Sequence, residues 1–345
     1  MSDPRLLVTT SPFLKDSAST AWIMWHVSLS LAPVVLVATW FFGGSVPLVI
    51  LAAIAGAVVP EGIQTILRRN ARQPQAPPLR DGSAFLTGLL LALTLPPGIP
   101  LWMAFLGGLV SVVLGKTVFG GIGSNVFNPA LVGRAFLQAA FPATMTSWLP
   151  VAEAGSRAQV PATLFTTPLL AADVDAISAA TPLSQATFGQ PTPEFADLLF
   201  GAVPGSLGET GALVILLAGL YLAVRGIVNW RIPLSILATV WLVGSGLHLL
   251  DPAGYPGGMF HLTAGGLMLG AWFMASDPVT SPMTQAGCWV FGALIGVLVV
   301  VIRVFGGLPE GVMYAILFAN AATPLINRFT QPRTFGTRFK PGFTR

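Results

Sequence analysis

Apolar runs of about 20 residues recur along the whole chain, and they constrain the fold more than any other feature. A run of this length is what a helix needs to cross the hydrocarbon core of a bilayer. Only 9% of the 345 residues are charged, whereas ordinary soluble domains are about 25% charged. No interval between the runs is long enough for a soluble domain of ordinary size. The sequence therefore predicts an all-α polytopic membrane protein.

About ten transmembrane helices are expected from these runs. The third run, 81–97, has a short apolar part and stops at a proline pair, so a short or tilted helix is expected there. The expected helices are 21–42, 46–67, 81–97, 101–118, 131–141, 212–228, 233–250, 259–275, 287–305 and 310–326.

Lysine and arginine gather at alternate ends of the expected helices. They lie in 68–80, at Arg225 and Arg231, and in the tail after residue 327. Because cytoplasmic loops collect these residues, both chain ends are expected in the cytoplasm. The interval 143–208 carries five acidic residues against Arg157 alone, and it is expected on the extracytoplasmic side. No basic stripe has interleaved exposed aromatics, so nucleic acid is not an expected partner.

An internal repeat supports this count of helices. Val46-Pro-Leu-Val-Ile-Leu-Ala52 matches Ile232-Pro-Leu-Ser-Ile-Leu-Ala238, and Val118-Phe-Gly-Gly-Ile122 matches Val304-Phe-Gly-Gly-Leu308, both at an offset of 186 residues. Five spans in each half make the second half enter from the opposite side, as in inverted-repeat transporters. The expected division is a first repeat at 1–142, an outer loop at 143–208, a second repeat at 209–327 and a basic tail at 328–345.

The longest polar interval contains Asp175-x-x-Ser178-Ala179-Ala180-Thr181. This resembles the acceptor motif D-x-x-S/T-G/A-A-T, on whose threonine a flavin transferase esterifies FMN. A modifying enzyme must reach the hydroxyl, so an exposed loop is expected. No histidine lies nearby in the sequence to activate Thr181, and a separate enzyme must do the chemistry. The alternative is an ordinary loop of small residues.

A Gly/Asn segment, 119–130, separates two expected helices. Its Gly120-Gly-Ile-Gly123 follows a membrane helix rather than a strand, which argues against a dinucleotide loop. Polar backbone at membrane depth is tolerated where protein or a cavity satisfies it. We therefore expect a tight turn here, with Asn125 and Asn128 available for polar contacts to a cofactor.

Few residues in this chain are suited to binding metal or haem. Cys288 is the single cysteine, which excludes an intrachain disulfide and a four-cysteine cluster from this chain alone. A two-histidine haem would need two of His26, His248 and His261 to face each other. No metal site and no catalytic residue are expected.

Ionisable side chains within membrane segments are costly and are functional candidates by default. They are Glu61, Lys116, Arg134, Asp277 and Glu310. Glu61 and Lys116 are expected to pair within one half, and Glu61 and Asp277 are candidate ion-pathway residues. The alternatives are helix-end snorkelling and, for Asp277, which precedes a proline, capping of a broken helix.

Several of these motifs together resemble the RnfD/NqrB family. Its members are membrane subunits of the Rnf ion-translocating ferredoxin:NAD oxidoreductase and, more distantly similar to this chain, of the sodium-translocating NADH:quinone oxidoreductase. The motifs are Ser11-Pro, Asp81-x-Ser-Ala with Leu95-Pro-Pro97, Gly120-Gly-x-Gly-x-Asn-x-Phe-Asn-Pro-Ala130, Asp175-x-x-Ser-Ala-Ala-Thr181 and Asp277-Pro-Val-Thr280. The family commonly has glycine where this chain has Ala179.

The resemblance implies a bacterial inner-membrane subunit that relays electrons between ferredoxin and NAD, coupled to Na⁺ or H⁺ translocation. It implies FMN esterified to Thr181, with Asp175 and Ser178 in the cofactor motif, and it permits a second, non-covalent flavin. The implied partners are other subunits of the complex, a flavin transferase and lipid. Two readings from other classes stay open: a passive channel or secondary transporter, which suits the repeat equally well, and a structural scaffold with an unmodified Thr181.

Overall fold

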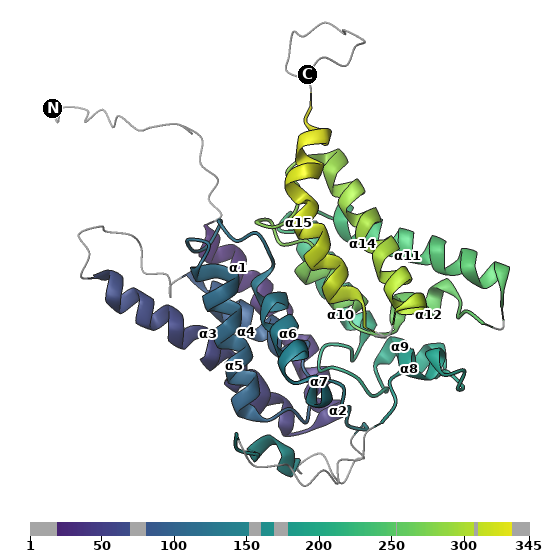
Figure 1. Ribbon diagram of the computed structural model, residues 1–345, viewed down its shortest axis with the longest axis horizontal. Coiled ribbons are helices and arrows are strands. Elements are labelled where there is room, and N and C mark those ends of the chain that lie inside the picture. The colour runs from purple at the N-terminus through teal and green to yellow at the C-terminus, as the bar shows by residue number, and fades with distance from the viewer. Residues whose placement is uncertain are drawn as a thin grey trace, which may run out of the picture.

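The computed structural model describes residues 19–69, 81–151, 160–168, 179–252, 254–306 and 310–332. These residues form helices, turns and loops, with no strand among them (Figure 1). Four helical stretches in the described part are long and apolar enough to cross a membrane: Thr20–Phe42, Ser45–Leu67, Arg231–Leu250 and Gln285–Phe305. The prediction of an all-α polytopic membrane protein is therefore confirmed.

The first half of the chain is built around one long helix and the shorter helices beside it. Its elements are α1 (Thr20–Ser30), α2 (Ala32–Phe42), α3 (Ser45–Arg69), α4 (Ser83–Leu93), α5 (Leu101–Val112), the π-helix η2 (Val113–Thr117), α6 (Pro129–Ala140) and α7 (Pro142–Met145). Leu31 interrupts the first span, where Pro33 follows in the first turn of α2.

Three short helices lie between the halves, and longer ones form the second half. The short helices are η3 (Ala162–Phe165), α8 (Pro182–Thr187) and α9 (Phe195–Phe200). The second half contains α10 (Ala212–Val224), α11 (Arg231–Leu250), α12 (Gly258–Thr263), α13 (Leu267–Leu269), the π-helix η4 (Gly270–Met274), α14 (Gln285–Phe305) and α15 (Val312–Thr330). Figure 1 shows α3 to α6 grouped on one side and α11, α14 and α15 on the other.

Small residues let the longest helices of each half approach closely. A Cβ atom on Gly56 of α3 would overlap the Phe105 carbonyl of α5. In the second half, a Cβ on Gly292 of α14 would lie 2.5 Å from the Ser235 Cβ of α11. Glycine and serine at such contacts are typical of membrane helix pairs. The opposite faces carry exposed apolar side chains such as Leu51 and Leu242, which suit a lipid environment.

The expected continuous helix at 259–275 is wrong, because α12 ends at Thr263 and α13 begins at Leu267. Gly265 between them has φ of +71°, a left-handed conformation that favours glycine. The Arg303 guanidinium of α14 donates to the carbonyls of His261 and Ala264, at 2.6 and 2.8 Å. Broken helices persist at membrane depth only when other groups satisfy the freed carbonyls, and here Arg303 does so.

The segment before α10 joins the two halves through its backbone. The Leu207 N–H donates to the Leu95 carbonyl at 3.1 Å, and the Gly208 N–H donates to the Leu93 carbonyl at 2.5 Å. The last carbonyls of α4 have no partner within the helix. A segment from the other half therefore completes the end of α4.

Candidate functional site

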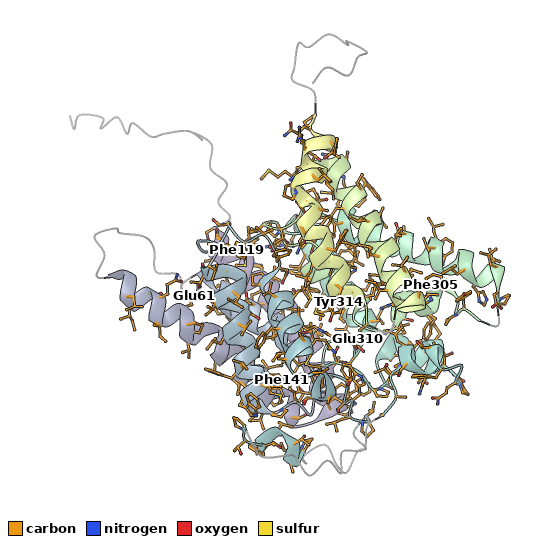
Figure 2. The ribbon with its side chains drawn as sticks, viewed as in Figure 1. Glu61, Phe119, Phe141, Phe305, Glu310 and Tyr314 are labelled. Carbon is orange, nitrogen blue, oxygen red and sulfur yellow. The ribbon has the colours of Figure 1, made fainter. Side chains whose placement is uncertain are left out.

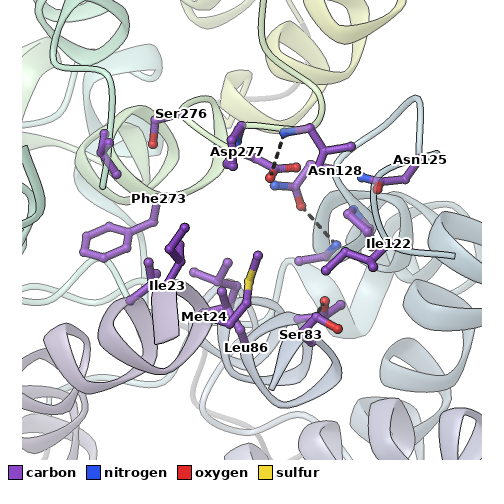
Figure 3. Close-up of a pocket in the computed structure, with 18 of the residues that line it drawn as sticks. Ile23, Met24, Ser83, Leu86, Ile122, Asn125, Asn128, Phe273, Ser276 and Asp277 are labelled. Atoms are coloured by element: carbon purple, nitrogen blue, oxygen red, sulfur yellow. Dashed lines mark hydrogen bonds between the residues drawn. The ribbon is translucent and has the colours of Figure 1, made fainter. Parts of the chain in front are cut away.

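A cavity lies between the two halves of the chain. Figure 3 shows side chains from α1, α4, residues 122–128, η4 and residues 276–277 surrounding an open centre. Its apolar wall includes Met24, Leu86 and Phe273, and its polar edge includes Asn125, Asn128 and Asp277. Apolar walls with a few placed polar groups are typical of small-molecule sites.

Asn128 holds one side of the cavity to the other. Its side-chain oxygen accepts from the backbone N–H groups of Ala130 and Leu131, at 3.0 and 3.4 Å, which caps α6. Its side-chain nitrogen donates to the Met274 carbonyl of η4 at 3.1 Å. The buried Asn125 amide donates to the Phe127 carbonyl at 3.3 Å. The sequence segment expected to form a tight turn therefore forms one edge of the cavity.

Asp277 follows η4 and faces the same cavity. Its carboxylate accepts from the Val279 N–H at 3.4 Å and from the Thr280 hydroxyl at 3.2 Å. These two hydrogen bonds hold the turn that follows η4, and they keep the carboxylate at the edge of the cavity.

Glu61 and Lys116 form a buried ion pair within the first half, as the sequence predicted. The Lys116 ammonium donates to Glu61 Oε1 at 2.6 Å and to the Ser83 hydroxyl at 2.5 Å. Ser83 in turn donates to the Asp81 carboxylate at 2.5 Å. Ser83 and Lys116 also line the cavity. Residues from α3, α4 and η2 thus meet in one chain of polar contacts at its edge.

Thr181 does not lie on an exposed loop, and that expectation was wrong. The residue is 3% exposed. Its hydroxyl caps α8 by accepting from the Ser184 N–H at 3.3 Å, and it lies 3.1 Å from the Ser184 hydroxyl. Leu183, two residues on, packs in a cluster with Leu198, Val203 and Ala264. The other motif residues in the prediction, Asp175 and Ser178, lie outside the described residues.

A second group of charged side chains, most of them buried, joins the halves. Arg134 of α6 forms an ion pair with Glu310, which lies near the centre of the molecule in Figure 2, whereas Glu61 lies within the first group of helices. Sequence reasoning named both partners but missed Glu209 and Arg303 beside them. The sequence offered one indication of Arg303, because it is the sole charged residue in the apolar run 287–305. Glu209 directly precedes the apolar run of α10.

The chain matches the model of the NQR2, RnfD, RnfE family over residues 7–336. It belongs to this family. The D subunit of the proton-translocating ferredoxin:NAD(+) oxidoreductase complex of Clostridium ljungdahlii is 39% identical over 347 aligned residues, covering 96% of each chain. The D subunit of the ion-translocating oxidoreductase complex of Sodalis glossinidius is 42% identical, covering 96% of this chain and 99% of the relative. The family resemblance drawn from the motifs is confirmed.

Proposed function

We propose that this chain, a membrane subunit of a multi-subunit ion-translocating oxidoreductase, relays electrons through FMN esterified to Thr181. The observation that carries the proposal is the acceptor motif ending at Thr181, in a chain that matches the family almost throughout. The electrons pass between ferredoxin and NAD, the substrates that the name of the Clostridium ljungdahlii relative states. When bound, FMN supplies the capacity to accept and pass on electrons.

The surroundings of Thr181 are compatible with attachment of FMN to its hydroxyl once α8 opens locally. Ala180 is exposed and Ala179 is half-buried, so the backbone entering the site is at the surface and carries little side-chain bulk. The hydroxyl itself is enclosed by its bonds to Ser184. A flavin transferase must therefore displace the first turn of the six-residue α8, a small cost for so short a helix.

The cavity between the halves supports a second, non-covalent flavin. An isoalloxazine ring system is flat and largely apolar, with hydrogen-bonding groups along one edge. Apolar side chains such as Met24 and Phe273 suit its faces, and Asn125, Asn128 and Asp277 suit its polar edge. The flavin would thereby lie between helices of both halves.

The finer topology is also part of the proposal. Ten spans in two inverted repeats would make α11 and α14 the counterparts of α3 and α5 at the offset of 186 residues. Support comes from the packing, because α3 lies along α5 and α11 lies along α14, each with small residues at the contact. The basic segments support a topology with both termini in the cytoplasm of a bacterial inner membrane and the segment that carries Thr181 in the periplasm.

Glu61 and Asp277 are proposed for the ion pathway. Moving one charge against 100 mV costs about 2.3 kcal/mol, which an electron falling through about 100 mV also releases. Asp277 faces the cavity, so its charge is close to the proposed second flavin. Glu61 is already paired with Lys116, and an ion would have to compete with that ammonium.

Counting flavins before and after acid denaturation tests the proposal. Protein from cells that also make the flavin transferase should retain one flavin on the chain and release another. Met24→Trp, which fills the cavity, should lower the released flavin and leave the retained flavin unchanged. Met283→Trp is the control, because Met283 is 94% exposed. A chain that retains no flavin would contradict the proposal and favour a channel.

A further inference from the structure

A buried carboxyl group, Glu209, lies near a partly exposed one, Glu310, where the halves meet. Glu209 lies directly before α10, and Glu310 lies directly before α15. A Cβ on Gly266, in the break between α12 and α13, would lie 3.9 Å from Glu209 Oε1. The Glu310 carboxyl is near enough to act electrostatically on Glu209. Two nearby carboxylates repel each other when both are ionised, and a proton on one of them removes that repulsion.

The neighbouring charges decide which carboxyl carries the proton. Arg134 pairs with Glu310, so its positive charge is directed at that carboxyl. Arg303 donates to the carbonyls of His261 and Ala264 rather than to Glu209. Glu209, which is 6% exposed, keeps Oε1 buried without a hydrogen-bond partner, and so does Arg303 at Nε. Glu209 is thus the neutral member of the group.

The electrostatics agree with this assignment. Burial, followed by the nearby Glu310 carboxyl, raises the pKa of Glu209 well above its ordinary value. Arg134 and the Ser206 hydroxyl lower it, and their effect is smaller. The Glu209 carboxyl therefore holds its proton as the pH rises past the point where an exposed glutamate has ionised.

We propose that Glu209 is a proton-binding site of this protein, and that Arg303 is its alternate partner. Loss of the proton to water leaves a buried carboxylate. Because Arg134 is already paired with Glu310, the Arg303 guanidinium, on which the Glu209 carboxyl acts electrostatically, is the cation left to neutralise it. Arg303 would then release the carbonyls of the break between α12 and α13. A metal cation is disfavoured, because Arg134 and Arg303 repel it and it needs several oxygen ligands, whereas a proton needs one.

The helix break connects this site to both proposed flavin positions. A Cβ on Gly265 would meet the Leu183 side chain of α8 and lie 3.0 Å from the Arg303 guanidinium. Leu183 is two residues from Thr181, and on the other side of the break η4 lines the cavity. The link between proton exchange and electron transfer rests on the proposed function; the proton site itself does not.

Two measurements on the whole complex test this site. Infrared difference spectra across a pH titration should show a carboxylic acid C=O band that disappears as the pH rises and that Glu209→Gln lacks. In membrane vesicles, Glu209→Gln should lose ion translocation while electron transfer continues. Glu194→Gln is the matched control, because Glu194 is exposed before α9 on the same connecting segment, and it should behave as wild type.

Each outcome bears on the proposal. The proposal would be overturned if the Glu209→Gln complex kept the carboxylic acid band and translocated as many ions per electron as wild type. If that variant fails to assemble, Glu209→Asp keeps a carboxyl and should shift the band rather than abolish it; an unshifted band would also overturn the assignment. Flavin fluorescence is read on the same samples. The pH titration does not need flavin. A chain without flavin fluorescence that still shows the carboxylic acid band therefore contradicts only the proposed function.

Discussion

Exchanging Thr181 for valine is expected to abolish the covalent flavin and the electron transfer that depends on it. Valine keeps the branched shape at this buried position and removes the only atom that could form the phosphoester. The lost helix cap costs about 1 kcal/mol, which is too little to unfold the chain. Ultraviolet fluorescence of the denatured protein in a gel, beside the ferredoxin:NAD activity of membranes, measures both effects.

Thr187→Val is the control for this experiment. Thr187 ends the same short helix, is exposed, and donates its hydroxyl to the Leu183 carbonyl at 2.9 Å. It should keep both fluorescence and activity. A Thr181→Val chain that remains fluorescent would place the flavin on another residue. A dark wild-type chain, made together with the transferase, would remove the basis for the electron relay.

Of the substitutions proposed for this protein, Lys116→Met is expected to lower the free energy of unfolding the most. The substitution leaves the Glu61 carboxylate, which is 1% exposed, without its ammonium partner. Breaking a buried pair from one side typically costs about 3–5 kcal/mol, because the remaining charge is buried and uncompensated. The Ser83 hydroxyl also loses a donor. Thermal unfolding in detergent should show a markedly lower midpoint for this variant.

A double-mutant cycle separates the ion pair from packing effects. Glu61→Gln together with Lys116→Met removes both charges, and this double variant should be more stable than Lys116→Met alone. Glu194→Gln, at an exposed carboxylate, should change stability by less than about 0.5 kcal/mol. If the double variant is no more stable than the single one, the loss comes from packing in η2 and not from an uncompensated charge.

Apolar periodicity and charge were enough to predict the long helices and one buried contact. The spans 233–250 and 287–305 correspond to α11 and α14 within two residues at each end. Glu61 and Lys116 are 55 residues apart and were still predicted to pair, because a membrane interior leaves a buried charge few other choices. Two opposite charges in the apolar segments of one half therefore predict an ion pair.

The features that were missed depend on tertiary contacts. The break after Thr263 follows from Arg303, which satisfies carbonyls that a continuous helix would bond internally. Thr181 is buried because Leu183 packs against Ala264, a residue from a distant part of the chain. Glu209 gains significance only beside Glu310, and neither residue has a local pattern that indicates the other. Apolar periodicity cannot report such contacts.

The mass of one proteolytic peptide tests the central claim most directly. Trypsin cleaves after Arg157 and Arg225 and finds no lysine or arginine between them, so the peptide 158–225 contains Thr181. From cells that make the flavin transferase, it should carry the added mass of one FMN less one water, with fragmentation placing the addition on Thr181. An unmodified peptide, or an addition on another hydroxyl, would contradict the electron relay through Thr181.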